Sequence, residues 1–248
     1  KCINAKYRIG TTGTLDGTKT HKLVLTGMFG EAKQVTSTRK LIDNKTLADF
    51  KIQCLVLKYS EETCKEIKKM KYADEVEYIV TNPRRNEFIK NLTLDLKGNT
   101  LVLYNFVEKH GIPLHKLISD HAQEGRKVFF VSGGVDTETR EAIRATTETE
   151  DNAIIVASYG TFSTGINIRN LHNVVFTSPS KSRIRNLQSI GRGLRKGNNK
   201  TSAVLYDIAD DMRHKNYMNF AIRHFYERIN IYNEEKFSFK INELKLYG

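Results

Sequence analysis

The sequence predicts an α/β protein in which helices cover both faces of a parallel sheet. Short apolar runs rich in β-branched and aromatic residues recur along the chain, at 101–104, 128–131, 154–157, 174–176 and 203–206. They are continuous rather than alternating, which is typical of strands buried on both faces. The intervals 106–124 and 137–150 are long enough for crossover helices. A β-α-β-α-β order of this kind favours a parallel sheet.

The two ends of the chain have a different character. We expect residues 52–57 to form the strand that opens the main domain. Residues 1–30 resemble the end of a preceding domain, with a strand-like piece at 7–10 and a hinge within 30–44. Residues 212–235 read as one long helix, whose aromatic residues fit a docking stripe. The expected organisation is therefore 1–40 for the end of a first domain and hinge, 41–211 for the main domain, and 212–248 for a helical extension.

The composition favours a polyanionic partner. The 248 residues include 40 Lys and Arg against 28 Asp and Glu, a formal charge of +12. Such a field attracts nucleic acid or a membrane surface. No apolar run reaches the length of a membrane span, and no signal peptide is recognisable. Three cysteines without a CxxC pair argue against a disulfide framework and a zinc site, and favour a reducing compartment such as the cytoplasm.

The most informative segment is Gln188-Ser-Ile-Gly-Arg-Gly-Leu-Arg195. On a helix beginning near Ser182, one face would carry Arg185, Gln188, Arg192 and Arg195, and the opposite face Leu187, Ile190 and Leu194. A solvated basic helix face is the plainer interpretation. Two glycines inside the helix argue against it, because each costs about 1 kcal/mol relative to Ala and indicates close approach of a backbone or ligand.

Three further segments are weak alone. Residues 157–167, Ala-Ser-Tyr-Gly-Thr-Phe-Ser-Thr-Gly-Ile-Asn, follow a predicted strand, where ligands bind in open α/β sheets. Ser132-Gly133-Gly134 follows another strand. Residues 10–15, Gly-Thr-Thr-Gly-Thr-Leu, form a turn-like stretch near the start.

Together these segments resemble, in the correct order, the motifs of superfamily 2 helicases. Gln188-x-x-Gly-Arg192-x-x-Arg195 is similar to motif VI, residues 157–167 to motif V, residues 101–106 to motif IV, and Thr12-Gly13-Thr14 to motif III. Ser132-Gly133-Gly134 with Arg140 is similar to the motif that follows motif IV. The resemblance implies a RecA-like second motor domain, a remnant of the preceding RecA-like domain, and a C-terminal helical tail.

The resemblance also implies roles. Arg192 and Arg195, with Gln188, would reach the γ-phosphate of ATP, since a planar guanidinium matches phosphate oxygens. Gly165 and Asn167 would lie near the nucleotide, although many relatives have Asp in place of Asn167. Thr161, Ser163, Thr164, Ser132 and Gly133 would contact the DNA backbone, and Thr12, Gly13 and Thr14 would couple ATP hydrolysis to DNA movement.

The sequence contains no Gly-x-x-x-x-Gly-Lys-Ser/Thr and no Asp-Glu-x-His box. We therefore expect ATP and Mg²⁺ to be bound mainly by a first RecA-like domain upstream of Lys1, and this chain alone to be inactive as an ATPase. The implied function is ATP-dependent unwinding or branch migration of DNA, branched or single-stranded, in replication, recombination and repair. Two alternatives remain open: a double-stranded DNA translocase such as a restriction-enzyme motor, and a non-catalytic nucleic-acid-binding module.

Overall fold

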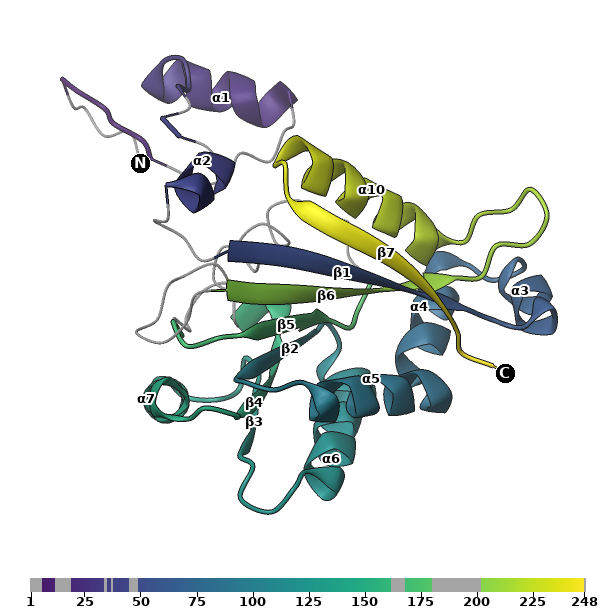
Figure 1. Ribbon diagram of the computed structural model, residues 1–248. Coiled ribbons are helices and arrows are strands. Elements are labelled where there is room, and N and C mark those ends of the chain that lie inside the picture. Colours follow the sequence, from purple (N-terminus) through teal and green to yellow (C-terminus); the bar gives the residue numbers. More distant parts are fainter. Residues whose placement is uncertain are drawn as a thin grey trace.

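One parallel sheet organises the molecule (Figure 1). The computed structural model describes residues 6–11, 19–33, 35–36, 38–44, 49–161, 168–179 and 202–247. Seven strands follow the order β3-β4-β2-β5-β6-β1-β7, and every pairing is parallel. Their bounds are β1 Asp49–Lys58, β2 Thr100–Tyr104, β3 Val128–Val131, β4 Ile154–Ser158, β5 Asn173–Phe176, β6 Ser202–Asp211 and β7 Ser238–Lys245. The predicted parallel sheet is confirmed.

Helices lie on both faces of this sheet. Helices α5 (Pro83–Asp95) and α6 (Ile112–His121) pack on one face, and α7 (Thr137–Thr149) and α10 (Phe220–Glu234) on the other. The remaining described helices are α1 Lys19–Phe29, α2 Thr38–Asp43, α3 Glu61–Ile67, α4 Tyr72–Thr81 and the π-helical turn η1 Val107–Gly111. No described helix is long and apolar enough to cross a membrane.

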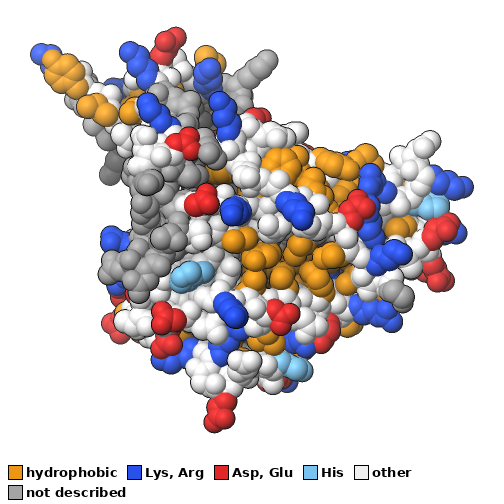
Figure 2. Space-filling view, viewed as in Figure 1, with side chains coloured by type: hydrophobic (Ala, Val, Ile, Leu, Met, Phe, Trp, Pro, Cys, Tyr) orange, Lys and Arg blue, Asp and Glu red, His pale blue; other side chains and the backbone are white. Residues whose placement is uncertain are grey.

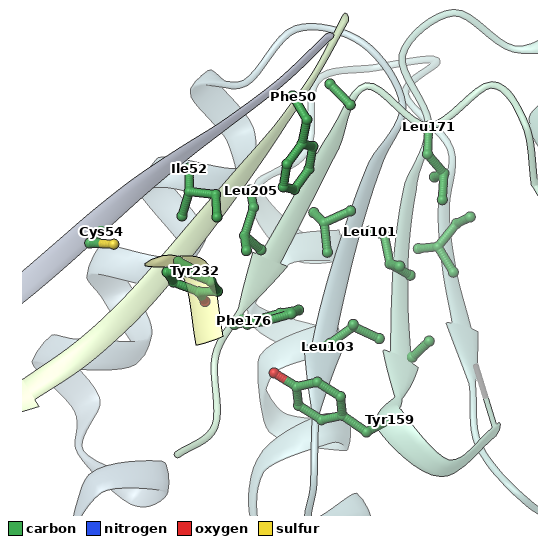
Figure 3. Close-up of a cluster of buried hydrophobic side chains, with 14 of the residues drawn as sticks. Phe50, Ile52, Cys54, Leu101, Leu103, Tyr159, Leu171, Phe176, Leu205 and Tyr232 are labelled. Atoms are coloured by element: carbon green, nitrogen blue, oxygen red, sulfur yellow. The ribbon is translucent and has the colours of Figure 1, made fainter. Parts of the chain in front are cut away.

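The strands are apolar without alternation because each faces two cores. Leu101 and Leu103 of β2 join the cluster beneath α7 and α10, which Figure 3 shows. Val102 and Tyr104 of the same strand join the cluster beneath α5 and α6. Because both faces of the sheet are buried, the strands have no solvent-facing side on which polar residues would be favoured.

The C-terminal segment differs from the predicted helix over 212–235. Helix α10 begins only at Phe220, because the buried carboxylate of Glu75 accepts hydrogen bonds from the backbone N–H groups of Phe220 and Ala221 and from the side chain of Asn219. Ser238–Lys245 then forms β7, which pairs with β1 at the edge of the sheet. The expected helical extension over 212–248 is therefore wrong in its last part, where half-exposed residues form an edge strand.

The N-terminal segment also differs in part. The strand-like piece at 7–10 is not a strand, and the expected hinge contains α2. Helix α1 leaves Leu23, Val24 and Met28 about half or more exposed. The expected boundary near residue 40 remains a prediction.

Candidate functional site

The carboxyl ends of the parallel strands meet at one edge of the sheet, where ligands bind in open α/β folds. The turn after β3 carries the predicted residues Ser132 and Gly133. The backbone N–H of Val135 donates to the Ser132 carbonyl (3.2 Å) and so closes the turn. Arg140 donates through Nε to the Val135 carbonyl (2.7 Å), which holds its guanidinium against the turn. Gly133 is exposed.

The turn after β4 lies beside it. Ser158 Oγ donates to Thr161 Oγ1 (2.8 Å) and accepts from the Thr161 N–H (3.2 Å). A Cβ atom placed on Gly133 would lie 4.0 Å from Thr161 Oγ1. Two of the loops that the sequence assigned to DNA contact are therefore neighbours, although Thr161 itself is only 6% exposed.

The other predicted site residues lie outside the described residues. They are Thr12, Gly13, Thr14, Ser163, Thr164, Gly165, Asn167, Gln188, Arg192 and Arg195. Their assignments remain predictions.

The end of β5 carries polar residues that the sequence analysis did not assign. The carbonyl of Leu103 accepts hydrogen bonds from both the N–H (3.1 Å) and the hydroxyl (2.7 Å) of Thr177. Ser178 Oγ accepts from the Asn105 N–H (3.1 Å), and the Asn105 side chain donates to the Pro179 carbonyl (3.4 Å). The chain just before the segment with Gln188 is thus fixed to the end of β2.

A buried ion pair between Arg85 and Asp210 contacts the residue that follows β5. Arg85 donates to Asp210 through Nε (2.7 Å) and Nη2 (3.0 Å), and Nη2 also donates to the Thr177 carbonyl (2.8 Å). The hydroxyl of Tyr59 donates to the same carboxylate (2.8 Å). Burial alone would lower the pKa of Arg85, but Asp210 and Tyr59 raise it. No local pattern reveals the pair, because its members lie 125 positions apart.

His110 is fully buried and contacts the end of β5. Its Nδ1 lies 3.2 Å from Ser178 Oγ. Burial and the charge of Arg85 lower the pKa of His110 to about 3, so the ring is neutral at neutral pH. Ser178 lies two positions after β5, and this place at a strand end was the sequence signal that could have found it.

Charge does not mark a binding surface on the face of the molecule seen in Figure 2. On the face shown in Figure 2, Lys and Arg side chains are interspersed with Asp and Glu around an apolar area. Within the described residues, no group of three or more His, Cys, Asp or Glu side chains could hold a metal ion.

Comparison with known proteins agrees with this arrangement. The family model for the helicase conserved C-terminal domain matches residues 84–197. Residues 84–197 are thus similar to helicase C-terminal domains. Over 256 residues it is 35% identical to the ATP-dependent DNA helicase uvsW of Enterobacteria phage T4, an alignment covering 98% of this chain and 50% of that protein. The chain thus spans about half the length of the curated relative that it matches.

Solved structures give a similar fold. The crystal structure of T4 UvsW superposes with a TM-score of 0.69 at 35% identity, over 89% of this chain and 45% of that one. The Type ISP restriction-modification enzyme LlaBIII bound to DNA gives a TM-score of 0.60 at 14% identity, over 88% of this chain and 17% of that one. The latter likeness concerns the fold alone. The resemblance to superfamily 2 helicases and the RecA-like fold are confirmed.

Proposed function

We propose that this chain is the second motor domain of an ATP-dependent DNA helicase, acting with a first motor domain that supplies the phosphate cradle. The observation that carries the proposal is the approach of the Gly133 turn to Thr161 at the carboxyl edge of a helicase C-terminal fold. The 35% identity to a phage DNA helicase supports a motor over a simple binding module.

The nucleic-acid contact in this proposal is to the backbone. The Ser132–Gly133 turn is open to solvent, and Arg140 is anchored beside it through a single nitrogen, Nε, in a hydrogen bond to the Val135 carbonyl. Thr161, Ser163 and Thr164 would add hydroxyl donors from the neighbouring loop. Guanidinium, hydroxyl and backbone N–H groups all suit phosphate oxygens and carry no base code.

ATP chemistry would be divided between two domains. ATP and Mg²⁺ would be held mainly by the first motor domain, with Gly165 and Asn167 near the nucleotide. Arg192 and Arg195, supported by Gln188, would stabilise charge on the transferring phosphoryl group. Thr12, Gly13 and Thr14 would couple ATP hydrolysis to movement of the DNA.

Titration of a single-stranded oligonucleotide at several salt concentrations tests the backbone contact in this chain. Binding should weaken steeply with salt, with a log–log slope of about 0.7 per phosphate contacted. Arg140→Ala should reduce affinity for the oligonucleotide and lower that slope by about 0.7, the contribution of one phosphate contact. Arg144→Ala is the matched control, because Arg144 lies one turn further along α7 and pairs with Glu141. Equal losses in the two variants, or binding that is flat with salt, would contradict the proposed contact.

For the full-length protein we propose branched DNA as the preferred substrate, in replication, recombination and repair. The support is the identity to uvsW over nearly the whole chain. Unwinding of a four-way junction should exceed that of a blunt duplex of equal length. Equal rates would favour a general double-stranded DNA translocase instead.

A further inference from the structure

Three consecutive residues at the end of β5, Thr177 to Pro179, are held from three different elements. The β2 end provides the Leu103 carbonyl and both the backbone and the side chain of Asn105. Helix α5 provides Arg85 Nη2, and η1 provides His110 Nδ1. Thr177 and Ser178 are at most 2% exposed. Ordering so short a stretch with so many buried polar contacts fixes its geometry tightly.

The stretch joins two parts of the proposed motor. Asn105 lies in the loop between β2 and η1, within residues 101–106 that resemble motif IV. Residue 180 begins the segment that carries Gln188, Arg192 and Arg195. Asn105 is hydrogen-bonded directly to Ser178 and Pro179, so the loop after β2 is tied to the residues that precede this segment.

Burying so many polar groups around residues 177–179 costs free energy of folding. Buried polar and charged groups are often replaceable by apolar side chains without loss of stability. Here, His110 Nε2 and Arg85 Nη1 are also buried without a hydrogen-bond partner in the described part of the chain. Stability alone therefore does not account for the choice of residues.

We propose that Asn105, His110 and Ser178 are positioning residues that couple the segment resembling motif IV to ATP turnover by the arginine-bearing segment. The proposal rests on the proposed function and adds to it the residues that position the arginine-bearing segment. Arg85 also fixes this stretch, because its Nη2 donates a hydrogen bond to the Thr177 carbonyl.

The test uses Ser178→Ala in the full-length protein, with Thr93→Val as its matched control. Both changes remove one buried hydroxyl, but Thr93 lies on α5 and its hydroxyl has no hydrogen-bond partner among the described residues. Steady-state ATP hydrolysis is measured with and without single-stranded DNA, together with the melting temperature and DNA affinity.

Ser178→Ala should lower the DNA-stimulated kcat about tenfold or more, since small misplacements of a catalytic group have large effects on rate. The KM for ATP and the Kd for DNA should stay within about twofold of wild type, because no binding group is removed. His110→Gln should repeat this split, and Thr93→Val should leave all four quantities near wild type.

Two results would overturn the coupling role. One is a DNA-stimulated kcat in Ser178→Ala equal to that of Thr93→Val. The other is a fall in kcat matched by equal losses in DNA affinity and melting temperature, which would make the cluster merely structural. A wild-type protein with no DNA-stimulated ATP hydrolysis would instead refute the proposed function, and the coupling with it.

Discussion

Arg85 and Asp210 form a two-point ion pair in the interior of the protein, with Nε–Oδ1 and Nη2–Oδ2 distances of 2.7 and 3.0 Å. Neither side chain is more than 1% exposed. The pair joins α5 to the end of β6, and through the Thr177 carbonyl it also joins β5. One guanidinium thus ties three elements together at the edge that carries the candidate site.

Removing one partner of this pair should be strongly destabilising. Arg85→Met would leave the Asp210 carboxylate buried and unpaired, and breaking a buried pair in this way costs about 3–5 kcal/mol. Urea denaturation would measure the free energy of unfolding. Arg144→Ala, which breaks an exposed pair with Glu141, should cost no more than about 1 kcal/mol. Similar losses of unfolding free energy in Arg85→Met and Arg144→Ala would contradict this prediction. They would mean that the Asp210 carboxylate becomes hydrated when Arg85 is removed.

Gly111 should not tolerate a side chain. A Cβ atom there would lie 2.4 Å from the Tyr104 ring, which is itself fully buried. Gly111→Ala should therefore destabilise the fold by about 1–3 kcal/mol through overpacking. Gly160→Ala serves as the control, since no described atom lies within 4 Å of its Cβ position. The melting temperatures of the two variants test this prediction. An unchanged melting temperature for Gly111→Ala would mean that η1 can move away from β2 at no cost.

His110 should make stability depend on pH. Its folded pKa of about 3 lies below the ordinary value of 6.5, so the unfolded chain binds a proton that the folded protein excludes. The contribution to stability is complete above about pH 6.5 and is lost as the pH falls toward 3, by about 1.4 kcal/mol per pH unit from this group. The free energy of unfolding of His110→Gln should therefore fall less steeply between pH 6.5 and 4. Parallel pH profiles would contradict this.

Much of the sheet is predictable because strands buried on both faces are apolar at every position. Residues 128–131 match β3 at both ends, and 101–104 differ from β2 by one residue. Strand β7 is not predictable in this way. It lies at the edge, where polar residues such as Lys240 and Glu243 are exposed, so its sequence lacks the continuous apolar run.

The candidate site divides in a similar way. The proximity of Gly133 and Thr161 follows from the rule that parallel strands end at one edge, since the two residues lie two and three positions after a strand. The Arg85–Asp210 pair and the His110–Ser178 contact depend instead on how distant elements pack. Such contacts leave no periodicity or local motif in the sequence.

The arginine-bearing segment is proposed to act on the phosphoryl group of ATP. ATP hydrolysis by the full-length protein, measured with saturating DNA in Arg192→Ala, Arg195→Ala and Arg195→Lys, tests this most directly. We predict that both alanine variants lose at least about a hundredfold in rate. Arg195→Lys should recover little, because lysine keeps the charge but not the planar fork. Arg185→Ala is the control and should lose much less. Normal ATP hydrolysis with lost DNA affinity in the alanine variants would contradict the claim and make this segment a nucleic-acid-binding surface.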